Sequence, residues 1–232
     1  GHEDWRYVNF RGTTGRAYWL MSFFGLQLFP TVLVFLGCLP LPAALSSLPP
    51  PEALRRLVPV LLASLRGTVC LYQGEELGLP EHTSLPDELR QDPTWLRTGQ
   101  QEYGRDGCRV PMPWEAQAPA YGFNATGATW LPQPGHWAAY TVASQDNDPG
   151  SFLNLYRAAL ALRPALWVDA GDVRWLTGPP AVLALARGAA QCWVNTGDVD
   201  VDLPEGYEVV LASVDGVDSA LPPDVAAWLV AS

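Results

Sequence analysis

Residues 68–80 of this chain, TVCLYQGEELGLP, carry its clearest indication of a fold class. The first five of these residues, 68–72, are β-branched or apolar and predict a short buried strand. The rest carries glycines and two adjacent acids, which predicts a polar loop. Upstream, between Glu52 and Gly67, leucines recur at helical spacing and predict an amphipathic helix. A helix, a buried strand and a polar loop in this order are typical of a repeat of a parallel β/α barrel, in which active sites gather at the carboxyl ends of the strands.

Two further motifs follow along the chain. The first is GRDGCRVPMPW, residues 104–114, and the second is SFLNLYR, residues 151–157. Together with YQGEELG, residues 72–78, these motifs resemble in content and order the α-amylase superfamily of glycoside hydrolases. The resemblance is to the α-glucosidase and oligo-1,6-glucosidase branch of that superfamily, and it extends over residues 52–232.

The resemblance implies an α/β fold for the first part of this region. Residues 52–164 are expected to form the end of a β/α barrel: the end of its seventh helix, its eighth strand, an active-site loop and the terminal helix. Val110 and Pro113 stand where a Thr and a Gln are usual in the motif at residues 104–114, as is expected within a subgroup.

Residues 171–232 carry a different pattern. Short apolar runs alternate with turns that contain Gly, Pro or Asp, and they predict an antiparallel sheet. The predicted strands are residues 182–187, 191–195, 207–213 and 226–230. The resemblance implies that this region is the small, sandwich-like C-terminal β domain that packs against the barrel.

The resemblance also supplies candidate substrate-binding residues. It implies that Arg105 contacts hydroxyls of a terminal glucose, because a guanidinium offers a fixed fork of donors that sets orientation. Asp106 and Glu75 are further substrate-binding candidates. The alternative for Arg105 is a structural ion pair with either of these carboxylates. Arg109 is expected to be structural, either stacked or paired within the loop.

No catalytic residue is predicted in this chain. Retaining glycosidases use two carboxylates about 5 to 5.5 Å apart, and in the resembled family both come from strands that would precede residue 52. Glu75 and Glu76 are adjacent, and neighbours on an extended segment point in opposite directions. We therefore expect a truncated or fused α-glucosidase derivative whose parent acts on α-linked gluco-oligosaccharides, and which is inactive by itself.

Metal and cofactor sites are not predicted. The run Asp146-Asn147-Asp148 looks like part of a calcium loop, but it lacks the spaced ligands and terminal Glu of an EF-hand. A solvated turn is the favoured interpretation. Three aromatic residues are expected either to pack within loops or to line a sugar platform: Trp95, Tyr103 and Trp114.

Residues 1–48 form a separate, membrane-like hydrophobic segment. The run from Ala17 to Pro40 has no charged residue, which predicts an N-terminal hydrophobic helix and membrane association through residues 17–45. The segments HEDWRY and GRAYW at its start resemble multi-spanning membrane proteins related to steroid 5-alpha reductases. The alternative is a buried hairpin of a soluble protein. A proline-rich junction, residues 49–51, follows.

Composition excludes one class of partner. The net charge is −10 and every basic residue is Arg, so the chain lacks the basic excess that nucleic-acid binding needs. Four scattered cysteines without paired spacing favour a reduced, cytoplasmic parent enzyme. Two alternatives to the truncated hydrolase remain: a single-span membrane protein with a non-catalytic glycosidase-like module, and a chimeric chain without evolved function.

Overall fold

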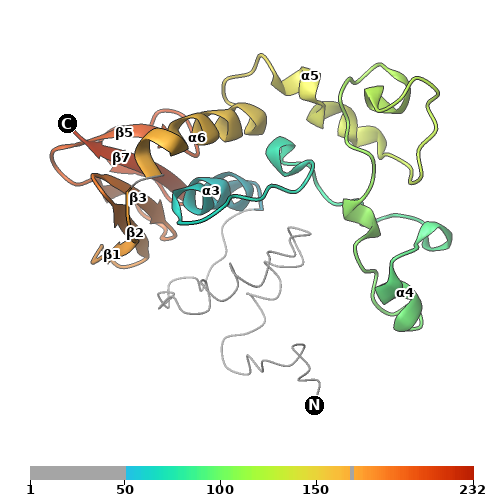
Figure 1. The fold of residues 1–232 in the computed structure, drawn as a ribbon, viewed down its shortest axis with the longest axis horizontal. Coiled ribbons are helices and arrows are strands. Elements are labelled where there is room, and N and C mark those ends of the chain that lie inside the picture. The colour runs from blue at the N-terminus through green and yellow to red at the C-terminus, as the bar shows by residue number, and fades with distance from the viewer. Residues whose placement is uncertain (1–50, 168–169) are drawn as a thin grey trace. The chain divides into compact units, whose positions relative to one another are not determined.

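The computed structural model describes residues 51–167 and 170–232, with helices and loops first and strands after them (Figure 1). The α-helices are α3 (Pro51–Ser64), α4 (Pro93–Arg97), α5 (Val142–Gln145) and α6 (Phe152–Trp167). Short 3-10 helices are η2 (Glu75–Leu77), η3 (Asp87–Leu89), η4 (Asp106–Cys108), η5 (Pro119–Gly122) and η6 (Gly135–Tyr140). The strands are β1 (Arg174–Leu176), β2 (Val182–Arg187), β3 (Ala190–Asn195), β4 (Val201–Asp202), β5 (Tyr207–Ala212), β6 (Ala220–Leu221) and β7 (Val225–Ala231).

Helices α3 and α6 contact each other along their lengths (Figure 1). The helix predicted from the leucine spacing is confirmed as α3, and the residues on its buried face are Leu54, Leu57, Val60 and Leu61. The Arg163 guanidinium of α6 donates to the carbonyl oxygens of Ala63 and Leu65, at 2.9 and 3.3 Å. It thereby satisfies carbonyls that the end of α3 leaves without intrahelical partners. The helix predicted to run to Pro164 continues to Trp167.

The strands form a five-stranded antiparallel sheet in the order β1-β2-β3-β7-β5 and a two-stranded sheet of β4 and β6. The four predicted strands are confirmed as β2, β3, β5 and β7, each within two residues of its expected ends. The three strands that were not anticipated, β1, β4 and β6, are only two or three residues long. Runs this short carry no readable alternation of apolar and polar residues.

Both faces of the central strands are covered. Along β7, Val225, Ala227 and Leu229 point to a core that also contains Leu221 of β6 and Trp193 of β3. Because successive side chains alternate between faces, Trp228 points the other way. Its indole Nε1 donates to the carbonyl oxygen of Val60 in α3 at 2.9 Å.

Two more side chains join this face of the sheet to the helices. The ring of Trp228 meets that of Trp167 edge to face, with the centroids 5.4 Å apart. The buried Arg187 of β2 donates to the carbonyl oxygens of Ser64 and Trp167, at the ends of α3 and α6. The sheet is therefore attached to the helix pair by aromatic packing and by hydrogen bonds to helix ends.

The prediction of a buried strand at residues 68–72 is wrong. These residues have no regular secondary structure, and Leu71 and Tyr72 are 40% and 44% exposed. A parallel strand is held by hydrogen bonds to strands on either side and by helices over both faces. Within residues 51–167 and 170–232 every strand belongs to the two antiparallel sheets, so the segment has no strand to pair with.

The predicted hydrophobic helix in residues 1–48, the membrane association through residues 17–45 and most of the junction 49–51 lie outside the described residues. Among the helices that the structure does describe, none has the length and apolar character needed to cross a membrane.

Candidate functional site

The QGEELG motif forms a tight turn that packs on the start of α6. Gly74 and Gly78 flank η2 with φ of +85° and +60°, values that favour glycine. A Cβ at Gly78 would lie 2.7 Å from the ring of Phe152, so the motif glycine is also needed for close packing. Leu77, between the two glycines, is completely buried. The motif therefore fixes the course of the loop against the helix.

Glu75, one of the predicted substrate-binding residues, is bound to neighbouring protein groups on both carboxylate oxygens. Oε1 accepts a hydrogen bond from the Tyr156 hydroxyl of α6 at 2.9 Å, and Oε2 accepts from the backbone N–H of Tyr72 at 3.1 Å. Burial raises the pKa of Glu75, and these two hydrogen bonds offset part of the rise. Burial and the nearby Glu75 charge raise the pKa of Tyr156, so the tyrosine stays protonated and remains a donor.

The raised pKa of Glu75 leads to a prediction about the Glu75→Gln variant. A carboxyl whose pKa is higher in the folded state than in the unfolded state costs stability once pH rises through the folded pKa. The glutamine amide keeps an oxygen for the Tyr156 hydroxyl and removes the charge, but its NH₂ group faces the Tyr72 N–H and cannot accept that hydrogen bond. We therefore expect the melting temperature of the variant to fall less than that of the parent chain as pH rises above 4.5.

The control is Glu75→Ala, which leaves the Tyr156 hydroxyl without its acceptor. We expect this variant to lose about 1 to 3 kcal/mol of stability. A glutamine variant whose melting temperature falls as steeply as that of the parent above pH 4.5 would show that the Glu75 charge carries no cost in stability.

The RDGCR motif is anchored by two buried carboxylates. Asp106 is 4% exposed, and its Oδ2 accepts the backbone N–H groups of Gln91 and Asp92, both at 2.8 Å. Asp92 is 3% exposed, and its Oδ2 accepts the backbone N–H of Arg105 at 3.1 Å and the Arg109 guanidinium at 2.8 Å. The two acids therefore bind each other's segments reciprocally.

Gly104 makes this arrangement sterically allowed. Its φ is +67°, and a Cβ there would lie 2.5 Å from the Asp92 carboxyl carbon. The next residue, Arg105, is exposed at the surface. The loop thus combines a hydrogen-bonded backbone with an exposed arginine residue.

The predicted site residues occupy different environments. Asp106 faces the 91–92 backbone and Glu75 faces α6, so both carboxylates serve as internal acceptors. Arg109 is paired within the loop as predicted, with its guanidinium 2.8 Å from Asp92 and 3.8 Å from Asp106.

One of the aromatic candidates takes the packing alternative. Trp95 is 4% exposed and stacks on Tyr103 with ring centroids 5.5 Å apart. The Arg90 guanidinium lies 4.0 Å from the Tyr103 ring centroid. Tyr103 itself is 58% exposed, and Trp114 is 48% exposed.

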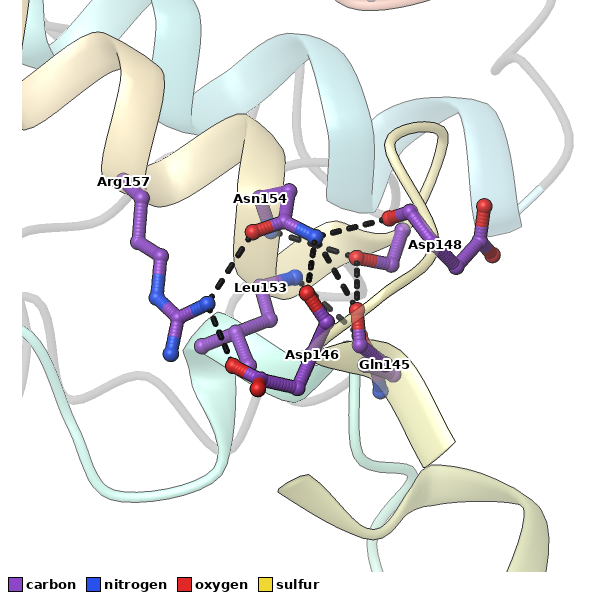
Figure 2. A network of polar contacts seen from close by, with 7 residues as sticks. Gln145, Asp146, Asp148, Leu153, Asn154 and Arg157 are labelled. Atoms are coloured by element: carbon purple, nitrogen blue, oxygen red, sulfur yellow. Dashed lines mark hydrogen bonds and ion pairs between the residues drawn. The ribbon is translucent and has the colours of Figure 1, made fainter. Parts of the chain in front are cut away.

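The segment 146–148 begins the approach to α6 and is a hydrogen-bonded turn (Figure 2). The Asn154 amide donates to the carbonyl oxygens of Asp146 and Asp148, at 3.1 and 2.8 Å. The Asp146 carboxylate pairs with Arg157 at 2.7 Å, and the Asp148 carboxylate accepts the Gly150 N–H. In the part of the chain that the structure describes, no group of three or more His, Cys, Asp or Glu side chains is placed to hold a metal ion.

Gln145 is a structural residue that sequence reasoning missed. It is 8% exposed, its amide donates to the carbonyl oxygen of Leu77, and its Oε1 accepts the backbone N–H of Leu153. It therefore joins the QGEELG turn to the first turn of α6; Figure 2 shows Gln145 beside Leu153. A polar residue in a stretch without periodicity gives no sequence signal for such a role.

Comparisons with known proteins agree with these motifs. A family model described as the alpha-amylase catalytic domain matches residues 51–170. A probable alpha-glucosidase of Rhizobium meliloti is 46% identical over 154 residues, which are 63% of this chain and 27% of that protein. A glucan 1,6-alpha-glucosidase of Streptococcus dysgalactiae is 28% identical over 186 residues, 70% of this chain and 34% of that protein.

Solved structures show the same fold. An alpha-glucosyl transfer enzyme, 34% identical, superposes with a TM-score of 0.63 over 78% of this chain and 36% of its own. An isomaltulose synthase from Klebsiella, 22% identical, superposes with a TM-score of 0.62 over 78% of this chain and 38% of its own.

Fold and motifs together define a segment of a glycosidase catalytic domain followed by an antiparallel sheet. The chain belongs to the alpha-amylase family of glycosidases. The matched part covers only 27% of the Rhizobium meliloti protein, 34% of the Streptococcus dysgalactiae protein and 36% of the alpha-glucosyl transfer enzyme. The family match begins at residue 51, and the segment predicted to resemble steroid 5-alpha reductases, residues 1–48, lies outside it.

Proposed function

We propose that this chain is the C-terminal part of an α-glucosidase-type glycoside hydrolase. The parent activity is hydrolysis of terminal α-glucosidic bonds in oligosaccharides. The names of the relatives support this proposal, since they include alpha-glucosidases and glucan 1,6-alpha-glucosidase. In this proposal residues 52–164 belong to the catalytic barrel and residues 171–232 form the C-terminal domain.

Arg105 is the proposed substrate-binding residue of this chain. One observation carries the assignment: Asp92 accepts the Arg105 backbone N–H while the Arg105 side chain lies at the surface. A fixed backbone reduces the entropy lost when a long side chain binds a sugar hydroxyl. We assign Asp106 and Glu75 supporting roles, because their carboxylates hold the two loops in place.

The proposed catalytic acids of the parent enzyme lie outside residues 52–232. Neither Glu75 nor Asp106 suits the role of nucleophile or acid/base, because each is engaged by protein donors. Bond cleavage by retention needs two carboxylates about 5 to 5.5 Å apart across the substrate. The chain by itself is therefore a truncated or fused derivative without hydrolytic activity.

We place the parent enzyme in the cytoplasm. Cys70, Cys108 and Cys192 are free thiols in the described part of the chain. Burial raises the pKa of both Cys108 and Cys192 to about 12. Such thiols stay protonated at neutral pH and are poor nucleophiles for disulfide exchange.

Two measurements test the proposal. Incubation of the chain with p-nitrophenyl α-glucoside should release p-nitrophenol no faster than buffer, and clear turnover would contradict the absence of catalytic acids. In the chain labelled with ¹⁵N-arginine, maltose or isomaltose should shift the Arg105 Nε–H signal. Arg105→Ala should abolish binding, whereas Arg174→Ala, at an exposed position on β1, should not. Equal binding by both variants would remove Arg105 from the site.

A further inference from the structure

An exposed aromatic pair lies in the loop that follows the RDGCR motif. Trp130 is 59% exposed and Phe123 is 37% exposed, and their rings meet edge to face with centroids 5.2 Å apart. Exposed aromatic surface is costly in water and often marks a binding site. We call these two residues the Phe123–Trp130 platform.

The platform is tied to the loop that carries Arg105. The indole Nε1 of Trp130 donates to the carbonyl oxygen of Arg109 at 2.8 Å. The hydrogen bond fixes the ring in place although most of its surface is exposed. Trp130 is therefore anchored to the backbone of the same motif that presents the Arg105 guanidinium.

The segment between the two rings is bonded internally. The Asn124 Oδ1 accepts the backbone N–H groups of Thr126 and Gly127, at 3.0 and 2.9 Å, and the Asn124 amide donates to the carbonyl oxygen of Ala128. A loop closed in this way presents its aromatic side chains in one arrangement. Pre-organisation of this kind favours ligand binding because less entropy is lost.

The chain entering the platform is held in an unfavourable conformation. Ala120 and Tyr121 have φ of +47° and +48°, a region that L-residues with a Cβ rarely adopt. Tyr121 holds the conformation, since its hydroxyl donates to the carbonyl oxygen of Gly135 at 2.9 Å and its carbonyl oxygen accepts the Trp114 N–H at 2.7 Å. Strain maintained by several contacts is typical of functional loops.

We propose that the Phe123–Trp130 platform binds a second glucose ring of an α-linked gluco-oligosaccharide, next to the ring that Arg105 contacts. The inference rests on the proposed function. One face of a pyranose ring carries only C–H groups, and this face stacks on an aromatic ring while the hydroxyls remain hydrated. The net charge of −10 disfavours a phosphorylated ligand.

The experiment is a sugar titration of the full chain labelled with ¹⁵N-tryptophan. Maltotriose should shift the Trp130 Nε1–H signal. Glucose at equal concentration should shift this signal much less, because its single ring is expected to bind at Arg105. Trp130→Ala and Phe123→Ala should weaken maltotriose binding by about fivefold or more. Trp130→Phe, which keeps a stacking ring and also controls for folding, should lose less. Trp175→Ala is the matched control, because Trp175 is an exposed tryptophan on β1, 38% exposed.

The outcomes separate this inference from the proposed function. If Trp130→Ala weakens maltotriose binding and Arg105→Ala does not, the platform stands and the role of Arg105 fails. If Arg105→Ala weakens binding of both sugars and Trp130→Ala weakens neither, the platform is overturned and the proposed function stands. A third outcome is that Trp130→Ala leaves the sugar affinity unchanged but converts a dimer into a monomer in ultracentrifugation. This outcome also overturns the proposed sugar contact and makes the platform a contact between two copies of the chain.

Discussion

Replacement of Arg187 by Met should destabilise the C-terminal part of the chain by about 3 kcal/mol. Arg187 is 3% exposed on β2. Its Nε donates to the carbonyl oxygen of Gly171, and its Nη1 to that of Ser64 at 3.0 Å. The second terminal nitrogen donates to the carbonyl oxygen of Trp167. The Met side chain fills most of the volume but leaves the three carbonyl oxygens without these donors.

Urea denaturation followed by circular dichroism measures this effect. Arg187→Lys should fall between the parent chain and the Met variant, because an ammonium group has no planar fork to reach three separated oxygens. Arg174→Met removes an exposed arginine from the same sheet and should change stability by less than about 0.5 kcal/mol. If the two Met variants unfold at the same urea concentration, Arg187 does not join the sheet to the helices.

Helix α3 and the longer strands of this chain were predictable because their signals are local. The leucine spacing of α3 and the apolar runs of β2, β3 and β7 depend only on neighbours in sequence. The segment 68–72 has the composition of a buried strand but lies exposed without regular structure. Strand formation there depends on partner strands, and composition carries no information about whether such partners are present.

The site was predictable to a lesser degree. The motif glycines predicted a loop, and Gly78 and Gly104 are positions where a Cβ would collide with Phe152 and Asp92. Asp92 caps α4 by accepting the Thr94 N–H, a role that was not predicted. Its further hydrogen bonds to a segment thirteen residues away follow from tertiary structure and leave no mark in the local sequence.

Asp92 is the residue on which the presentation of Arg105 most depends. It accepts the backbone N–H groups of Thr94 and Arg105 and the Arg109 guanidinium. Asp92→Ala leaves these donors without their acceptor and leaves a half-buried guanidinium with only the more distant Asp106. We expect the loop of residues 90–109 to lose about 3 kcal/mol of local stability.

Amide hydrogen exchange measures that loss directly, since the Arg105 amide should exchange at least about a hundredfold faster in Asp92→Ala. Asp92→Asn keeps an oxygen acceptor but removes the charge, so it should show an intermediate rate. Asp146→Ala removes a carboxylate from a surface ion pair about half exposed on both sides, and should leave the Arg105 amide unchanged.

A pH series gives an independent check without mutation. Burial acts to raise the pKa of Asp92, but the Thr94 and Arg105 N–H groups and the Arg109 charge outweigh it and hold the pKa below its usual value. A carboxyl with a depressed folded pKa contributes stability above its unfolded pKa, near 3.8, and loses it as pH falls through the folded pKa. Protection of the Arg105 amide, corrected for intrinsic exchange, should therefore fall below pH 3.8 in the parent chain. In Asp92→Ala the protection of the Arg105 amide should already be low at neutral pH, because the variant lacks the carboxylate that holds the loop. Strong protection of this amide in the variant at neutral pH would mean that other contacts hold Arg105.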